Sequence, residues 1–121
     1  MGLTAIQTVF VTLASEQLQD LVMFYQGLLG QEPLMYRPGR YGEFILPGLR
    51  LALFKPSDGA EFVGAAGRMS LCIEVEDLVS AIATLKQLGY PPPGDIIHAS
   101  HGQEIYAYDP DGNRLILHQS S

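Results

Sequence analysis

The chain has 121 residues, of which 47% are apolar, and a formal net charge of −6 with only seven Lys and Arg. This length buries the core of one ordered domain, and the single Cys72 has no partner for an internal disulfide. The scarcity of basic residues argues against nucleic acid as a partner. The sequence shows neither an apolar run long enough to span a membrane nor the pattern of a secretory signal peptide, which predicts a cytoplasmic protein with no membrane contact.

The first half of the chain predicts one helix among four strands. In residues 6–13 the aliphatic Val9, Val11 and Leu13 alternate with the mixed set Thr8, Phe10 and Thr12, which is the pattern of a half-buried strand. Ser15 is the expected N-cap of a helix whose apolar residues recur at helical spacing until Gly30 ends it. Three more strands are expected, and Pro47-Gly48 forms the turn between the last two. These strands cover residues 34–37, 42–46 and 49–55.

The second half predicts the same order of elements. A strand over 69–75 leads to a helix over 78–88, with Asp77 as its cap. The three prolines at 91–93 force an extended link, because a helix cannot continue through them. The turn at 109–113 then joins the last two of three further strands. These strands cover residues 95–99, 103–108 and 114–119.

Short sequence signals also recur between the halves. Leu29-Gly30 returns as Leu88-Gly89, and the segment 48–53 returns as 112–117. A repeat of this length is a whole supersecondary unit. We therefore expect one domain over residues 1–121. Its parts are a first βαβββ module at 4–56, a connector at 57–67 and a second module at 68–121.

The first and last strands of each half have two unlike faces. The aliphatic face should pack on the helices, and it comprises Val9, Val11, Leu13, Leu49, Leu51, Leu53, Leu71, Ile73, Val75, Leu115 and Leu117. The other face is mixed, and it comprises Thr8, Phe10, Thr12, Arg50, Ala52, Phe54, Ser70, Cys72, Glu74, Arg114, Ile116 and His118. Such a face either lines a ligand-binding concavity or meets solvent.

The chain resembles the vicinal oxygen chelate superfamily of glyoxalases, bleomycin-resistance proteins and extradiol dioxygenases. The matching segments are Phe24-Tyr25 before Leu29-Gly30, the strand-to-helix step 74–78, and Asp109-Pro110-Asp111-Gly112-Asn113-Arg114 before the last strand. The resemblance implies an α+β fold in which two βαβββ modules form a cupped, incompletely closed eight-stranded mixed sheet with one helix per module. It also implies a homodimer.

Enzymes of that superfamily usually hold a divalent metal with His, Gln or Glu from the first and last strands of each module. By resemblance, these positions fall here on Phe10, Ala52, Ser70 and Ile116. Three of these side chains offer no donor atom, and serine alone is a poor ligand. We therefore expect no metal and no cofactor.

The favoured hypothesis is a protein that binds a small, partly apolar and anionic molecule in the cup. Arg50 and Arg114 occupy equivalent positions and suit an anion, unless each reaches solvent or a carboxylate such as Glu74. His118 suits proton transfer but lies near the chain end. The full set of expected ligand-binding residues is Phe10, Arg50, Phe54, Ser70, Glu74, Tyr106, Tyr108, Arg114, Ile116 and His118. Tyr106 and Tyr108 equally suit packing against a helix, and Cys72 has no basic neighbour that would make it a nucleophile.

Two other hypotheses remain open. One is a metal-dependent lyase, isomerase or dioxygenase with an unusual ligand set drawn from His98, His101, Glu104 and His118. Residues three apart point to opposite faces of a strand, so a loop would have to bring His98 and His101 together. The other is a structural or interaction protein whose cup is filled by side chains such as Phe10 and Ile116.

Overall fold

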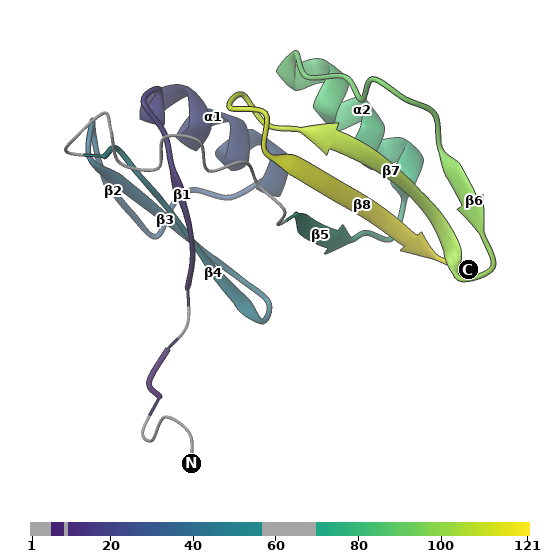
Figure 1. Ribbon diagram of the computed structural model, residues 1–121, viewed down its shortest axis with the longest axis horizontal. Helices are drawn as coiled ribbons and strands as arrows, with labels where there is room; N and C mark the ends of the chain where they lie inside the picture. Colours follow the sequence, from purple (N-terminus) through teal and green to yellow (C-terminus); the bar gives the residue numbers. More distant parts are fainter. Residues whose placement is uncertain (1–5, 9, 57–69) are drawn as a thin grey trace.

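The structure, a computed structural model, describes residues 6–8, 10–56 and 70–121 and contains two βαβββ modules (Figure 1). The first comprises β1 (Phe10–Ala14), α1 (Leu18–Leu29), β2 (Met35–Arg37), β3 (Tyr41–Leu46) and β4 (Leu49–Phe54). The second comprises β5 (Leu71–Glu74), α2 (Leu78–Leu88), β6 (Ile97–Ala99), β7 (Gly102–Tyr108) and β8 (Arg114–Ser120). The predicted connector 57–67 lies outside the described residues.

Each module builds one four-stranded mixed sheet, with strand order β1-β4-β3-β2 in the first and β5-β8-β7-β6 in the second. The first and last strands of each module pair in parallel, with Thr12 opposite Ala52 and Cys72 opposite Ile116. The remaining pairs are antiparallel. The predicted α+β class, the two modules and the incomplete closure are confirmed, with the eight strands divided between two open sheets.

The helix boundaries follow from their flanking residues. Gly30 and Gly89 end α1 and α2 with φ of 67° and 91°, a left-handed conformation that glycine adopts without a steric penalty. Asp77 caps α2 as predicted, because its carboxylate accepts the Ser80 N–H at 3.2 Å. The expectation that Ser15 caps α1 is wrong. The Ser15 N–H still donates to the Phe54 carbonyl in the sheet, so α1 begins later, after Gln17.

Both helices pack against the aliphatic faces of the sheets and share one core (Figure 1). The buried strand residues of this core include Leu51, Leu53, Leu115 and Leu117, as predicted. Partly buried residues of the same faces also pack against it, namely Val11, Leu13, Leu71, Ile73 and Val75. Leu49, beside the turn, is not part of this core, and Val9 lies outside the described residues.

The two modules meet through α1. The Tyr25 hydroxyl donates to Asp109 at 2.8 Å, and the Phe24 ring meets Tyr90 edge-on, with 5.2 Å between ring centres. The Gln17 side chain reaches Asp111 at 2.7 Å, beside the turn between β7 and β8. Because these contacts lie on the helix-covered side, they leave the mixed face of each sheet pointing away from the helices. No helix in the described part of the chain is long and apolar enough to span a membrane.

Candidate functional site

The mixed face of the second sheet carries most of the candidate residues. Strand register arranges them in rows, because residues that pair directly across a ladder share a face. Glu74, His118 and Glu104 form one row, and Cys72, Ile116 and Tyr106 form the next. Tyr108 lies opposite Arg114 at the far end. The ladder thus confirms that Arg114, Ile116 and His118 share the face that their alternation predicts.

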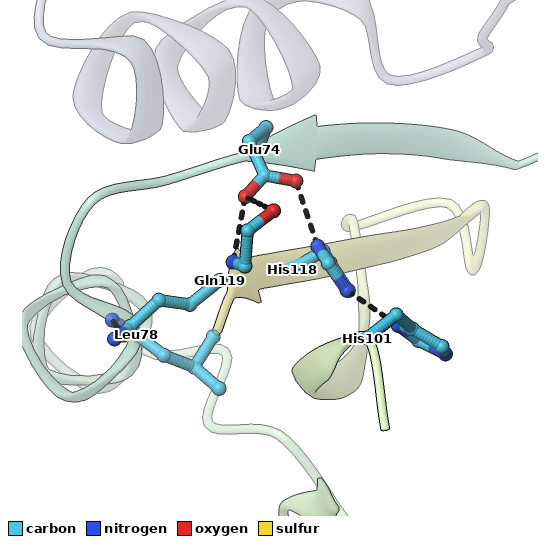
Figure 2. Close-up of polar contacts among 6 residues, drawn as sticks. Glu74, Leu78, His101, His118 and Gln119 are labelled. Carbon is cyan, nitrogen blue, oxygen red and sulfur yellow. Dashed lines mark hydrogen bonds and ion pairs between the residues drawn. The ribbon is translucent and has the colours of Figure 1, made fainter. Parts of the chain in front are cut away.

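Glu74, His118 and His101 form a chain of hydrogen bonds (Figure 2). Glu74 Oε1 lies 2.7 Å from His118 Nδ1, and His118 Nε2 lies 2.9 Å from His101 Nδ1. The other Glu74 oxygen accepts the backbone N–H and the hydroxyl of Ser120, each at 2.8 Å. The hydrogen bond from His118, followed by those from Ser120, holds the pKa of Glu74 below its ordinary value. A carboxylate only accepts, so His118 Nδ1 donates, and in a neutral His118 the Nε2 atom is then the acceptor for His101 Nδ1–H.

Glu104 completes a cluster with the two histidines. One ligand atom from each of His101, Glu104 and His118 lies within 4.8 Å of the other two. His98 is not part of this cluster, because β6 pairs it with Gln103 on the opposite face of the hairpin. Of the four residues in the unusual ligand set, the structure therefore brings three together. His101 lies in the turn before β7, where strand alternation does not fix side-chain direction.

Arg114 is exposed and held in place by two neighbours. Its Nε donates to Ser70 Oγ at 2.7 Å, and its Cζ lies 5.0 Å from the centre of the Tyr106 ring. No carboxylate of the described residues lies within ion-pair distance of this guanidinium. Arg114 is therefore oriented on the sheet face without a neutralising partner among those residues.

Arg50, its counterpart in the first sheet, has a different environment. Its Nε lies 3.6 Å from Glu43 Oε2, and its Cζ lies 5.1 Å from the centre of the Phe10 ring. Glu43 is buried and also accepts the Tyr41 hydroxyl at 2.7 Å. Burial, followed by this hydrogen bond, raises the pKa of Tyr41 to about 12. Glu43 is not among the residues expected from the sequence, although alternation over 42–46 would have placed it on the mixed face, opposite Ala52.

The other expected residues of the first sheet lie on the same face as Arg50. Phe10 is half-buried and pairs with Arg50, and Phe54 is half-buried and pairs with Tyr41. Arg50 and Arg114 share no hydrogen-bond or ion-pair partner within the described residues. A hollow of about 170 Å³ lies at the ends of β6, β7 and β8, and neither arginine lines it.

Cys72 lies on β5, opposite Ile116 on the mixed face of the second sheet, and is exposed. Partial desolvation of its sulfur, followed by the nearby carboxylates of Glu104 and Glu74, raises the pKa of the Cys72 thiol. A raised pKa reduces the thiolate fraction, and thiolate is the reactive form. This environment does not favour a nucleophilic cysteine.

The four positions that the resemblance assigns to a metal do not fit one. Phe10 and Ile116 present hydrocarbon, and Ala52 is buried opposite Glu43, whose two oxygens face Tyr41 and Arg50. Ser70 Oγ is the acceptor for Arg114. A divalent ion needs several lone pairs that converge on one point, and these four side chains do not supply them.

Comparison with known proteins identifies the family. No curated protein matches the chain. Similar solved structures include a fosfomycin resistance protein, FosX, from Listeria monocytogenes (18% identity, TM-score 0.75, covering 98% of this chain and 96% of that one). A glyoxalase-related enzyme from Fulvimarina pelagi is 23% identical, with a TM-score of 0.73 and coverage of 94% and 88%. Lactoylglutathione lyase from Agrobacterium tumefaciens is 20% identical, with a TM-score of 0.70 and coverage of 96% of each chain. Identities this low support the fold alone. The sequence profile of one family matches residues 7–117, and the chain therefore belongs to the Glyoxalase/Bleomycin resistance protein/Dioxygenase superfamily.

Proposed function

We propose that the protein binds a small, partly apolar, anionic molecule on the mixed sheet faces, with no metal at the four positions that the superfamily's enzymes use. The observation that carries this proposal is the environment of Arg114. Ser70 and Tyr106 fix its guanidinium, which has no carboxylate partner among the described residues. A fixed guanidinium presents a fork of N–H donors that matches a carboxylate or a phosphonate.

The walls of the binding surface come from aromatic and aliphatic side chains. Tyr106, Tyr108 and Ile116 share the mixed face of the second sheet with Arg114. On the first sheet, Phe10 lies beside Arg50, and Phe54 lies at the other end of β4 on the same face. A tyrosine supplies apolar area together with a hydroxyl that can bond a polar group of the ligand. At the other end of the second sheet, His118 and Glu74 add a polar edge.

The binding surface is completed in a homodimer. Met35 and Ile45 are each 45% exposed, and register places them on the same face of the first sheet as Arg50. A second copy would cover these apolar side chains and bring another mixed face against the first. Light scattering after size exclusion tests this part of the proposal, since a monomer at every concentration would contradict it.

Binding of simple anions to the purified protein tests the central claim. Benzoate, phenylphosphonate and inorganic phosphate are titrated in the presence of a chelator, and binding is followed by backbone NMR shifts. We expect the two aromatic anions to bind more tightly than phosphate and to shift residues around Arg114. Arg114→Met should weaken their binding about tenfold or more, because it removes a charged hydrogen bond.

Arg40→Met is the matched control, because Arg40 is an exposed arginine at the turn before β3 in the other sheet. Equal losses in the two variants would mean that binding reflects net charge alone. The proposal fails if no anion binds, or if every anion binds only when a metal is supplied.

A further inference from the structure

We propose that His101, Glu104 and His118 form a binding site for one transition-metal ion of the zinc class, separate from the four positions that the superfamily's enzymes use. Ligand atoms of the three side chains already lie within 4.8 Å of one another. The site is at the end of β8, four residues beyond Arg114, a span of about 13 Å along an extended strand. The site shares His118 with the polar edge of the anion-binding surface, and the bound ion goes beyond the proposed function.

The backbone explains why these side chains converge. Glu104 and His118 are directly opposite in the ladder between β7 and β8. Gly102 begins β7 with φ of 140°, and a Cβ at this position would overlap the carbonyl oxygen of Gln119. Only glycine allows β7 to start this close to β8. This close approach of Gly102 to β8 places the His101 ring against the His118 ring, with 5.0 Å between ring centres and 27° between ring planes.

Glu74 orients His118 for a metal. Because its carboxylate accepts a hydrogen bond from His118 Nδ1, the lone pair of His118 Nε2 points toward His101. A histidine that binds a metal through one ring nitrogen usually donates the other N–H to such a carboxylate, which fixes the ring and makes it a better ligand. Figure 2 shows this arrangement, with Glu74 on one side of His118 and His101 on the other.

The spacing requires only a small adjustment. His118 Nε2 and His101 Nδ1 are 2.9 Å apart and share a proton in the metal-free chain. Two nitrogens bound to one tetrahedral Zn²⁺ lie about 3.3 Å apart, since each bond is about 2.0 to 2.1 Å long. His101 lies in an exposed turn and can move by this amount. The metal would take the place of the proton between the two rings, His101 would carry its proton on Nε2 instead, and Glu104 would neutralise part of the charge of the ion.

The donor set indicates which ions fit. Two imidazoles and one carboxylate suit Zn²⁺, Ni²⁺, Cu²⁺ or Fe²⁺, whereas Ca²⁺ and Mg²⁺ prefer oxygen ligands alone. Three protein ligands leave a fourth position, and the exposure of His101 keeps that position accessible to water or to a small anion. Both oxygens of Glu74 are already engaged by His118 and Ser120, so Glu74 orients a ligand and does not bind the ion itself.

Metal titration of protein purified without a histidine tag tests this site. Chelator-stripped protein is titrated with Co²⁺, followed by Zn²⁺ in competition with a chromogenic chelator. We expect one Co²⁺ per chain, visible absorption bands of a four- or five-coordinate ion, and complete displacement by Zn²⁺. His101→Ala and His118→Ala should each lower the affinity at least a hundredfold. Glu74→Gln should lower it about 10- to 100-fold and keep the stoichiometry of one.

His98→Ala is the matched control, because it removes an exposed histidine three residues before His101 on the opposite face of the hairpin. It should leave the affinity unchanged, and so should Arg114→Met, which tests the anion site separately. The proposal is overturned if His98→Ala and His118→Ala lose equal affinity, or if binding is no tighter than that of free histidine. Ring ¹⁵N shifts of the unmodified chain provide a readout that needs no variant. If Zn²⁺ leaves the shifts of His101 and His118 unchanged, the cluster is a hydrogen-bonded chain and holds no metal.

Discussion

The phenol of Tyr25 donates a 2.8 Å hydrogen bond to Oδ2 of Asp109 and so ties the first module to the second. Asp109 is itself buried and organises the turn between β7 and β8. Its Oδ1 accepts the backbone N–H groups of Asp111 and Asn113, each at 2.9 Å, and its Oδ2 also accepts the Asn113 side chain at 2.7 Å. One carboxylate thus joins two of the segments on which the family resemblance rests, the Phe24-Tyr25 pair and the Asp-Pro-Asp-Gly-Asn turn.

This contact predicts the effect of removing the Tyr25 hydroxyl. Tyr25→Phe should lower the free energy of unfolding by about 1 to 2 kcal/mol, because Asp109 loses a buried partner but keeps its bonds within the turn. Urea denaturation gives this difference. Tyr36→Phe removes the hydroxyl of an exposed tyrosine and should change stability by less than about 0.5 kcal/mol. Equal effects in the two variants would rule out a structural role for the contact.

The same tyrosine predicts how stability responds to alkaline pH. Burial, followed by the charge of Asp109 and its hydrogen bond, raises the pKa of Tyr25 well above the ordinary value of 10.0. An unfolded chain loses this proton near the ordinary value, so above it the folded state binds more protons than the unfolded state. The contribution of Tyr25 is therefore full below pH 10 and falls as pH rises above that value, by up to about 1.4 kcal/mol per pH unit.

Tyr25→Phe removes this proton and should flatten the alkaline decline. Unfolding free energies of both proteins, measured by urea denaturation from about pH 8 to 11, should differ most at the lower pH and converge above about pH 10. A constant difference across this range would mean that Tyr25 ionises equally in the folded and unfolded chains.

Gly102 predicts a coupling between backbone geometry and the His101–Glu104–His118 cluster. Gly102→Ala should lower the unfolding free energy by about 1 to 3 kcal/mol, because φ is 140° and the new Cβ meets the Gln119 carbonyl. The turn must then move away from β8, so Co²⁺ affinity should also fall. Gly94→Ala is the control, since Gly94 has no atom within 4 Å of an added Cβ and no positive φ. A Gly102→Ala protein with normal stability and normal Co²⁺ affinity would contradict this account.

Sequence periodicity was sufficient for most of the fold. The helix predicted over 78–88 is observed as α2 (Leu78–Leu88), because an Asp cap and a Gly stop bound its apolar repeat. Among the described residues of the strand predicted over 6–13, residues 6–8 are not in a strand, and β1 covers Phe10–Ala14. Phe10 pairs with Arg50, the second residue of β4, and the chain turns at Pro47-Gly48 just before β4, so no strand of the described residues lies beside residues 6–8. The N-terminal end of β1 therefore depends on the register between β1 and β4, which alternation alone does not predict.

The candidate site was less accessible to sequence reasoning for the same reason. Alternation places Glu74 and His118 on the mixed faces of their strands, but it does not predict that the two residues pair. It also does not predict that His101, which lies in a turn, contacts His118. The repeat also equates Arg50 with Arg114. Their environments differ because β3 carries Glu43 at the position where β7 carries Tyr106, so one arginine meets a buried carboxylate and the other meets an aromatic ring.

This asymmetry predicts that the two arginines contribute differently to stability. Arg50→Met should lower the unfolding free energy by about 1 to 2 kcal/mol, because among the described residues it leaves the buried Glu43 carboxylate with only the Tyr41 hydroxyl as a partner. Arg114→Met should change stability by less than about 0.5 kcal/mol, since Arg114 is exposed and Ser70 can bond water instead.

A double-mutant cycle separates the Arg50 ion pair from packing on Phe10. Adding Glu43→Gln to Arg50→Met should restore part of the lost stability, because the unpaired buried charge is then absent. If the second substitution restores nothing, the loss comes from the contact between Arg50 and the Phe10 ring. If Arg114→Met destabilises as much as Arg50→Met, both arginines have the same structural role, and the proposed difference between a paired Arg50 and an anion-binding Arg114 is wrong.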